Sequence, residues 1–444
     1  MTCRILEPAR LHGSVQAPPA IGEALRALLL ASLGRGPCRF HGLNPPLVGK
    51  LREVTGILEA LGSGMSWEGD VLQVEPVPSG TWVSQQVPCH VCVDTEALLL
   101  MVPVLWAQGR RAVLRLRDEP EAFLLKGLQD LSRQAGTVIA RVEASQGQSA
   151  TIEVQGKLTS GSYEMDGSLP GMLISGMLIA LSHAADQQGQ DIPSRLTVTG
   201  SLACRAQVDR TLEWMKRFGR CYQEEGSGVF LLECAQGPYP EDVCIPGDWS
   251  KGAALLCANA LGSGVVVENL RESGEMSAFR GEARILDMLR QMGLLVFESW
   301  ENLYVTSPSR ARLLPLNADC RDMVDLVPVL ALLCTQACGE STLWGMRDSG
   351  HKNRKLLEAT VQFLTRMEAQ AQLSDQGDAL ILQGPIRLCG GVQAEVGGDS
   401  RMAMLLALAA LIAQEPITVS GMEILEEFWP GFLEDYQALG GRVS

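Results

Sequence analysis

The stretch Arg401-Met-Ala-Met-Leu-Leu-Ala-Leu-Ala-Ala-Leu-Ile-Ala413 is apolar on nearly every side of a helix, and it is one of six such runs in this chain. The runs recur about every 75 residues, and self-similarity of this kind indicates an internal repeat. A helix that lacks a polar face must be enclosed by other elements. The other five runs are Ala24–Ser32, Ala97–Ala107, Met172–Ser182, Lys251–Leu261 and Met323–Cys334.

Each run is followed by a polar turn, a β-like stretch and a second, amphipathic helix pattern that usually ends at a glycine. One unit is therefore predicted to be strand, buried helix, strand, outer helix, strand. Six such units predict an α/β (α+β) fold in which sheets wrap around helices, with the strands outside. The clearest outer-helix patterns are Leu51–Gly62, Val208–Gly219, Ala283–Gly293 and Gly431–Gly440.

The repeats also predict the domain organisation. A chain of 444 residues is long enough for two or three domains, and three repeats lie on each side of about residue 245. The Pro- and Gly-rich stretch Gly237–Asp248 predicts a linker, and Ala17–Ala20 is a second candidate crossing. We expect an N-terminal domain of residues 19–245 and a second domain of residues 1–18 with 246–444. One strand, at residues 3–16, is expected to join the second domain.

Composition narrows the functional classes. The net charge is −14 with only seven lysines, which argues against nucleic acid as a partner. The longest apolar run is too short to span a bilayer, and the N-terminus lacks a signal-peptide pattern. Thirteen scattered cysteines suggest reduced thiols in a cytoplasm, and the only CxxC, Cys89–Cys92, offers too few thiols for zinc. We expect a cytoplasmic monomer with no metal, no cofactor and no membrane contact.

Seven segments carry recognisable motifs, in order along nearly the whole chain: Leu6–Pro18, Arg26–Gly36, Asp166–Ser175, Gly247–Ala253, Asp322–Pro328, Asp399–Met404 and Phe428–Phe432. These motifs resemble those of the EPSP synthase (3-phosphoshikimate 1-carboxyvinyltransferase) family of enolpyruvyl transferases. The resemblance implies a two-domain inside-out α/β barrel, with three βαβαββ units in each domain. It also implies transfer of the enolpyruvyl group of phosphoenolpyruvate to shikimate 3-phosphate, in the shikimate pathway of aromatic amino acid biosynthesis.

The same resemblance implies site residues. Asp325 falls on the family's proposed general base and Lys352 on a residue near phosphoenolpyruvate, so these two are the candidate catalytic residues. The candidate substrate-binding residues, which match or replace family positions or lie beside them, are Arg26, Ser168, Arg205, Arg354 and Arg401.

Each candidate also has a structural interpretation. Arg26 could cap a helix, Asp325 could favour a helix dipole, and Asp399 to Arg401 could simply start the last buried helix. Lys352 and Arg354 lie in a polar, Gly-containing segment, where cations are common. If Arg401 binds a ligand, Arg401→Ala should abolish binding and leave the melting temperature nearly unchanged.

Many other ligand-binding positions of the family are replaced. Cations of the family fall on Ile21, Glu121 and Glu427, and the Glu of its catalytic Lys–Glu pair falls on Asn353. Replacing a cation by an anion adds repulsion to the lost attraction. The N-A-G-T loop falls on Glu96–Leu99, the S-S-Q contact on Pro170–Met172, and the His of D-H-R on Ser400.

Three functions remain open. The chain is a divergent carboxyvinyltransferase with substitute cations from elsewhere, a same-fold enzyme acting on a less anionic substrate, or a non-catalytic relative that binds a metabolite or a partner. In the first case the ligand is a small anionic metabolite, either phosphoenolpyruvate with shikimate 3-phosphate or an analogue.

Overall fold

The structure is a computed structural model, and it describes most of the chain. The described residues are 3–45, 47, 49–78, 90–142, 150–184, 190, 192–202, 204–236, 238–270, 284–298, 302–306, 312–321, 323–346 and 350–444. Cys89, Asp322 and Arg347 lie outside them, as does the side chain of Lys352. None of the helices in these ranges has both the length and the apolar character that crossing a membrane requires.

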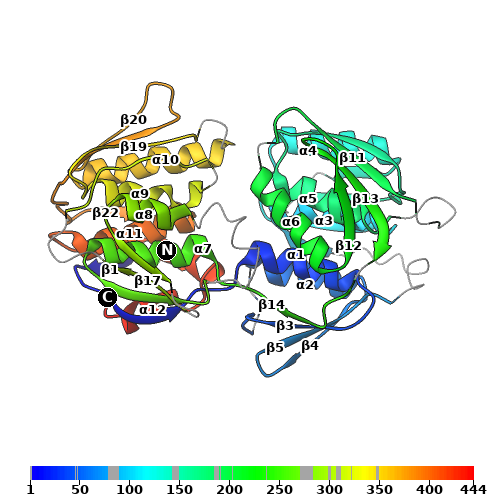
Figure 1. Cartoon of the computed structure of the whole chain (residues 1–444), viewed down its shortest axis with the longest axis horizontal. Helices are drawn as coiled ribbons and strands as arrows, with labels where there is room; N and C mark the ends of the chain where they lie inside the picture. The colour runs from blue at the N-terminus through cyan, green and yellow to red at the C-terminus, as the bar shows by residue number, and fades with distance from the viewer. Residues whose placement is uncertain are drawn as a thin grey trace. The chain divides into compact units, whose positions relative to one another are not determined.

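The chain forms two compact units (Figure 1). Unit 1 comprises Met1–Ala20 with Pro246–Ser444, and unit 2 comprises Ile21–Ile245. The chain therefore passes from one unit to the other twice. We propose that these units are the two three-repeat domains expected from the sequence.

Unit 2 contains three repeats, each with one apolar helix enclosed by sheets and one outer helix (Figure 1). The first consists of α1 (Ile21–Ser32), β3 (Cys38–His41), α2 (Gly49–Ala60), β4 (Gly64–Glu68), β5 (Val71–Glu75) and, from the far end of the unit, β14 (Asp242–Cys244). The second consists of β6 (His90–Val93), α3 (Thr95–Ala107), β7 (Ala112–Leu116), α4 (Ala122–Ala135), β8 (Val138–Val142) and β9 (Thr151–Gln155). The third consists of β10 (Ser162–Asp166), α5 (Gly171–Leu181), β11 (Ser194–Thr199), α6 (Arg205–Arg217), β12 (Arg220–Glu224) and β13 (Val229–Gln236).

Unit 1 repeats this order. Its first repeat is β2 (His12–Gln16), α7 (Trp249–Cys257), η2 (Ala258–Leu261), β15 (Gly264–Glu268), α8 (Ile285–Gln291), β16 (Leu295–Glu298) and β17 (Asn302–Thr306). The second is β18 (Asn317–Asp319), η5 (Val324–Leu326), α9 (Val327–Cys334), β19 (Gly339–Trp344), α10 (Gly350–Arg366), β20 (Gln370–Leu373) and β21 (Leu380–Gly384). The third is β22 (Gln393–Glu395), α11 (Ser400–Ile412), β23 (Ile417–Ser420), η6 (Met422–Glu427), α12 (Phe432–Ala438), β24 (Arg442–Val443) and β1 (Cys3–Glu7).

Within the described residues, all six sheets have four strands and one pairing pattern. A parallel pair is extended by two antiparallel strands, as in β10-β11-β13-β12 and β18-β19-β21-β20. The shared pattern confirms the prediction of an inside-out α/β barrel with three βαβαββ repeats in each unit. The remaining orders are β14-β3-β5-β4, β6-β7-β9-β8, β16-β17-β15-β2 and β22-β23-β1-β24.

One local prediction was wrong, and one short strand was missed. Residues 3–16 form two strands, because the chain turns at Pro8, and a proline has no N–H to donate to a ladder. These strands join different sheets of unit 1, where β1 pairs with β23 and β24, and β2 pairs with β15. The predicted linker also contains a strand, since β14 pairs in parallel with β3 and completes the first repeat of unit 2.

Close contact between apolar helices holds unit 2 together. The side chains of α5 are buried along its whole length, and α3 is buried from Ala97 to Trp106. The two helices approach so closely at Gly176 that an added Cβ would lie 2.6 Å from the carbonyl oxygen of Leu100. Only glycine permits this approach, because a backbone oxygen cannot move aside as a flexible side chain can.

We expect Gly176→Ala to lower the free energy of unfolding by about 1–3 kcal/mol, since the new methyl group forces α3 and α5 apart. Gly56→Ala is the matched control, because Gly56 lies in α2 with nothing within 4 Å of the added Cβ. That variant should raise the stability by about 0.4–1 kcal/mol. Chemical denaturation of both variants measures the difference, and equal stabilities would contradict the packing argument.

The proposed domains predict where a protease of broad specificity cuts first. Brief digestion should cleave near residues 236–248, where the chain leaves unit 2, and produce two large fragments. Mass spectrometry of the fragments locates the cut. A first cut inside one of the buried helices would show that the units are not independent domains.

Candidate functional site

The structure brings two of the predicted site residues of unit 1 into direct contact. Asp325 lies in the short helix η5, immediately before the buried helix α9, and Arg401 lies in the first turn of the buried helix α11. Arg401 Nη1 donates a hydrogen bond of 2.8 Å to Asp325 Oδ1. The Asp325 side chain remains 52% exposed, whereas that of Arg401 is 15% exposed. The guanidinium therefore holds a carboxylate that is still open to solvent.

Arg401 makes three further hydrogen bonds. Its Nε and Nη2 donate to the two oxygens of Asp399, over 2.9 and 2.6 Å, and its Nη1 also donates to Asn353 Oδ1 over 2.7 Å. Burial alone would lower the pKa of Arg401, but Asp399 and Asp325 outweigh burial and raise the pKa above its ordinary value. Asp399 also caps α11, because its Oδ1 accepts a hydrogen bond from the backbone N–H of Arg401. Arg401 is thus both a helix-start residue and the partner of Asp325.

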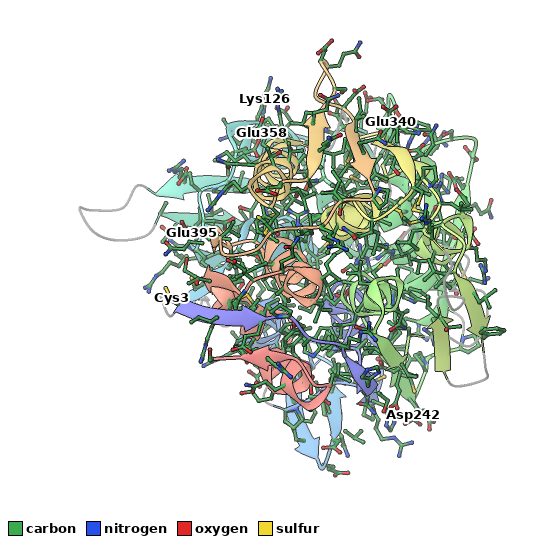
Figure 2. All side chains as sticks on the ribbon, turned by 90° about the vertical axis from the view of Figure 1, so that its left-hand side faces the viewer. Cys3, Lys126, Asp242, Glu340, Glu358 and Glu395 are labelled. Carbon is green, nitrogen blue, oxygen red and sulfur yellow. The ribbon has the colours of Figure 1, made fainter. Side chains whose placement is uncertain are left out.

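The helix α10 brings Asn353 to Arg401, and Lys352 precedes Asn353 in that helix. Nothing can be said of the Lys352 side chain, which lies outside the described residues. The Arg354 side chain contacts a residue of its own helix: its Nε lies 3.4 Å from Oε1 of Glu358, which is labelled in Figure 2. The Arg354 side chain is exposed, so this contact leaves it outside the pairing around Arg401.

Arg26, in unit 2, is buried among groups of this chain. Its guanidinium donates to Thr211 Oγ1 over 2.7 Å, to the carbonyl oxygen of Gly22 over 2.7 Å and to that of Gln207 over 3.3 Å. It also contacts the sulfur of Met172, on the first turn of α5. Burial lowers the pKa of Arg26 to about 10. The residue thus joins α1, α5 and α6.

Arg205, at the start of α6, is held by two carboxylates. Its Nη1 and Nη2 form a two-pronged pair with Glu224, over 2.6 and 2.9 Å, and its Nε lies 2.7 Å from Asp209 Oδ1. These contacts, with Glu224 the largest, raise the pKa of Arg205. Its charge is already paired by groups of the chain.

Ser168 lies in the turn between β10 and α5. Its backbone N–H donates a hydrogen bond of 2.8 Å to Asp166 Oδ1, and its side chain is exposed at the rim of an open pocket in unit 2. The structure shows Ser168, Arg26 and Arg205 each in different local surroundings, and none of them contacts another.

Lys50 is a cation that the sequence reasoning missed. It lies in the first turn of α2, and its Nζ contacts the carboxylate of Glu96 and lies 3.3 Å from Asp94 Oδ2. Burial disfavours its charge, but Glu96 and Asp94 outweigh burial and raise the pKa of Lys50. No short motif signals this contact, because Lys50 and Glu96 are 46 positions apart in the chain.

The N-terminal end of α3 is filled by carboxylates of the chain itself. Asp94 caps the helix, accepting from the backbone N–H of Ala97 over 2.8 Å, and Asp118 accepts from both the N–H and the hydroxyl of Thr95 over 2.9 Å. Helix N-termini attract anions, so these carboxylates occupy the place that a ligand's anion would take.

A second layer of charge surrounds this end. Glu53 accepts from the backbone N–H of Asp94 over 3.2 Å and pairs with Arg117. Burial raises the pKa of Glu53, and Arg117 opposes that rise. We call the charged residues around this helix end the α3 cluster, which holds four carboxylates and two cations. Its members are Lys50, Glu53, Asp94, Glu96, Arg117 and Asp118.

Lys251, in the first turn of α7, is a second cation that was not predicted. It pairs with Asp248, whose Oδ1 accepts from Ser250 Oγ over 2.6 Å and caps the helix. Its Nζ lies 5.7 Å from the ring centre of Phe428, beside the position where the family's lysine is replaced by Glu427. Burial would raise the pKa of Asp248, but Lys251 and Ser250 keep it below its ordinary value. Lys251 is therefore also neutralised by its own unit.

Comparison with known proteins gives one family. The family model described as EPSP synthase (3-phosphoshikimate 1-carboxyvinyltransferase) matches residues 5–436. A protein named 3-phosphoshikimate 1-carboxyvinyltransferase from Aeropyrum pernix is 30% identical over 99% of this chain and 96% of its own length. One of the same name from Clostridium kluyveri is 25% identical, over 99% of this chain and 97% of its own length.

Two solved structures share the fold. The EPSP synthase from Acinetobacter baumannii superimposes with a TM-score of 0.78 at 18% identity, covering all of both chains. The enolpyruvyl transferase NikO from Streptomyces tendae superimposes with a TM-score of 0.70 at 16% identity, covering 100% of this chain and 98% of its own.

The four contacts of Arg401 revise the expectation that its removal leaves stability unchanged. We now expect Arg401→Ala to lower the free energy of unfolding by about 1–3 kcal/mol, because Asp399, Asn353 and Asp325 lose the hydrogen bonds that the guanidinium donates. Arg354→Ala is the matched control, and its exposed single contact predicts a change within about 0.5 kcal/mol. Urea denaturation measures both, and a neutral Arg401→Ala would contradict this account.

Proposed function

This chain belongs to the EPSP synthase family, and we propose that it is an enzyme of the carboxyvinyltransferase type whose acceptor is less anionic than shikimate 3-phosphate. The proposal rests on one contrast: the predicted substrate-binding cations are paired within the chain, whereas the carboxylate of Asp325 is half exposed. Four predicted substrate-binding cations have described side chains, and all of them contact acceptors of the chain itself. These residues are Arg26, Arg205, Arg354 and Arg401.

Asp325 supplies the acid–base group of the proposed reaction. In carboxyvinyl transfer the acceptor's hydroxyl oxygen bonds to C2 of phosphoenolpyruvate while C3 takes up a proton, and the adduct then loses phosphate and a C3 proton to leave the enol ether. A base must take the proton of the hydroxyl in the first step. A carboxylate that is half exposed, and fixed by a guanidinium 2.8 Å away, has the access and the orientation for this step. The same position is the one at which the family resemblance implies a general base.

The α3 cluster supports a change in the charge of the ligand. Its four carboxylates outnumber its two cations, and two of the carboxylates already accept from the N–H groups of α3. A doubly charged phosphate brought to this end would meet repulsion from groups that stay in place. A hydroxyl-bearing acceptor without a phosphate would not.

The reaction named for the relatives is the second candidate. Identity of 30% over 99% of the chain favours it, and so does the retained contact between Asp325 and Arg401. It requires phosphate-binding cations, and two possible substitutes among the described residues, Lys50 and Lys251, are already paired with Glu96 and Asp248.

A phosphate-release assay with phosphoenolpyruvate and either shikimate or shikimate 3-phosphate separates the candidates. We expect no tight binding of phosphoenolpyruvate or glyphosate in the presence of shikimate 3-phosphate, and any turnover should favour an acceptor without phosphate. Micromolar glyphosate binding with shikimate 3-phosphate, or turnover at a relative's rate, would establish the second candidate instead.

The role of Asp325 has its own control. Asp325→Asn should lower the turnover found in that assay by about 10²–10⁴-fold, because it removes the proton acceptor. Asp287→Asn is the matched control, since Asp287 is an exposed carboxylate of unit 1 paired with Arg290. Saturable ligand binding without turnover of any acceptor would identify the chain as a non-catalytic relative.

A further inference from the structure

Unit 2 contains an open pocket outside the helix ends described above. It lies between α4 and the edge strand β10, closes against the turn that follows β10, and has a volume of about 530 Å³. Pockets of about 300–1,000 Å³ are the usual size for small-molecule sites. The lining that matters here comes from both walls: Phe123, Lys126 and Leu131 on α4, with Glu164, Asp166 and Leu169 opposite.

Two specific contacts fix the walls of this pocket. An added Cβ at Gly127 would lie 2.7 Å from Leu169 Cδ2, so glycine lets α4 approach the turn closely. Toward the other end of α4, the amide of Gln134 donates to the carbonyl oxygen of Glu164 over 2.9 Å and accepts from its N–H over 2.8 Å. The side-chain amide of Gln134 thereby makes the two hydrogen bonds to the edge strand β10 that a neighbouring strand would otherwise make. The space between these two contacts is therefore a defined part of the unit.

The polar groups of the pocket are of both signs. In the described part of the chain, neither the Lys126 ammonium nor the Glu164 carboxylate has an ion pair or a hydrogen bond, and Lys126 projects outward in Figure 2. Asp166 accepts hydrogen bonds from the backbone N–H and from the side chain of Ser168, so its carboxylate is held in place. The helix wall thus carries Lys126 together with Asp130, whose carboxylate pairs with Arg133, and the strand wall carries Glu164 and Asp166.

The pocket also has an apolar lining. Leu131 and Leu169 are buried and form its floor, whereas Phe123, in the first turn of α4, is 51% exposed. A single exposed apolar side chain is ordinary on a protein surface, but this ring lines a pocket. A ring also favours stacking against a flat partner.

We propose that this pocket binds a small zwitterionic amino acid with a flat apolar side chain. The carboxylate of the ligand pairs with Lys126, its ammonium pairs with Glu164 and Asp166, and its side chain packs on Phe123. The site shares no residue with the pairing around Asp325 in unit 1, although Ser168, one of the predicted substrate-binding residues, also lines the pocket.

Calorimetry and ligand-observed NMR on the full chain test this with L-phenylalanine and three analogues. L-phenylalaninamide lacks the carboxylate, N-acetyl-L-phenylalanine lacks the ammonium, and L-serine lacks the apolar side chain. L-phenylalanine should bind saturably. The amide and the N-acetyl compound should each have an affinity about fivefold lower, the loss expected for one exposed charge contact. L-serine should also bind more weakly, because it lacks the side chain that packs on Phe123.

Three variants assign each contact. Lys126→Met should remove the preference for L-phenylalanine over the amide, Glu164→Gln should remove the preference over the N-acetyl compound, and Phe123→Ala should weaken all aromatic ligands. The matched controls, Lys157→Met and Glu59→Gln, change exposed charges of unit 2 that do not line the pocket. They should bind as the parent does.

Two results would overturn the proposal. One is the absence of saturable binding by any of the four probes, and the other is binding whose preferences survive Lys126→Met and Glu164→Gln. Asp325→Asn should leave L-phenylalanine binding unchanged, so failure of the proposed reaction and failure of this site give different results.

Discussion

The whole fold depends on helices that lack a polar face and must be enclosed. Their contact is closest where Gly176 of α5 meets the backbone of α3, and no side chain separates the two helices there. Because the flanks of such helices are used for packing, polar chemistry is confined to their ends. Arg26 of α1 reaches Met172 at the start of α5 in unit 2, and Arg401 of α11 reaches Asp325 before α9 in unit 1.

Because polar groups are confined to the helix ends, the charged residues at those ends can change without disturbing the packing between the helices. The N-terminal end of a helix carries a partial positive charge and attracts anions. Here Asp94, Asp248 and Asp399 cap α3, α7 and α11, so that charge is satisfied from within. The nearby cations then neutralise the caps, as Lys50 does for Asp94, and add little attraction for a further anion. Under the proposed function, a site built this way keeps its shape while its preferred ligand changes.

Sequence reasoning succeeded where the pattern is local. The apolar runs predicted the six buried helices because burial on all sides leaves a periodicity that can be read directly, and repetition fixed the architecture. It failed at Pro8, where one expected strand is two, and at β14, because three residues are too few for a pattern.

Part of the candidate site could also be predicted. Asp325 and Arg401 were both named as site residues, and the structure places them 2.8 Å apart. The α3 cluster could not be found in the same way, because Lys50 and Glu96 come from different repeats. Arg205 looked available for a ligand, and its pairing with Glu224 depends on a strand 19 positions away. Contacts between elements decide which charges are free, and one sequence does not record them.

The two units differ in what their charged groups leave open. In unit 2 the carboxylates of Asp94 and Glu53 are 18% and 7% exposed and serve the chain's own N–H groups and cations. In unit 1, Asp325 is 52% exposed although Arg401 holds it. Asn353 accepts a hydrogen bond from Arg401, and an amide cannot exchange a proton as a carboxylate can. Under the proposed function, proton transfer at this end therefore rests on Asp325, and the change of substrate concerns the charge of the ligand more than the acid–base group that acts on it.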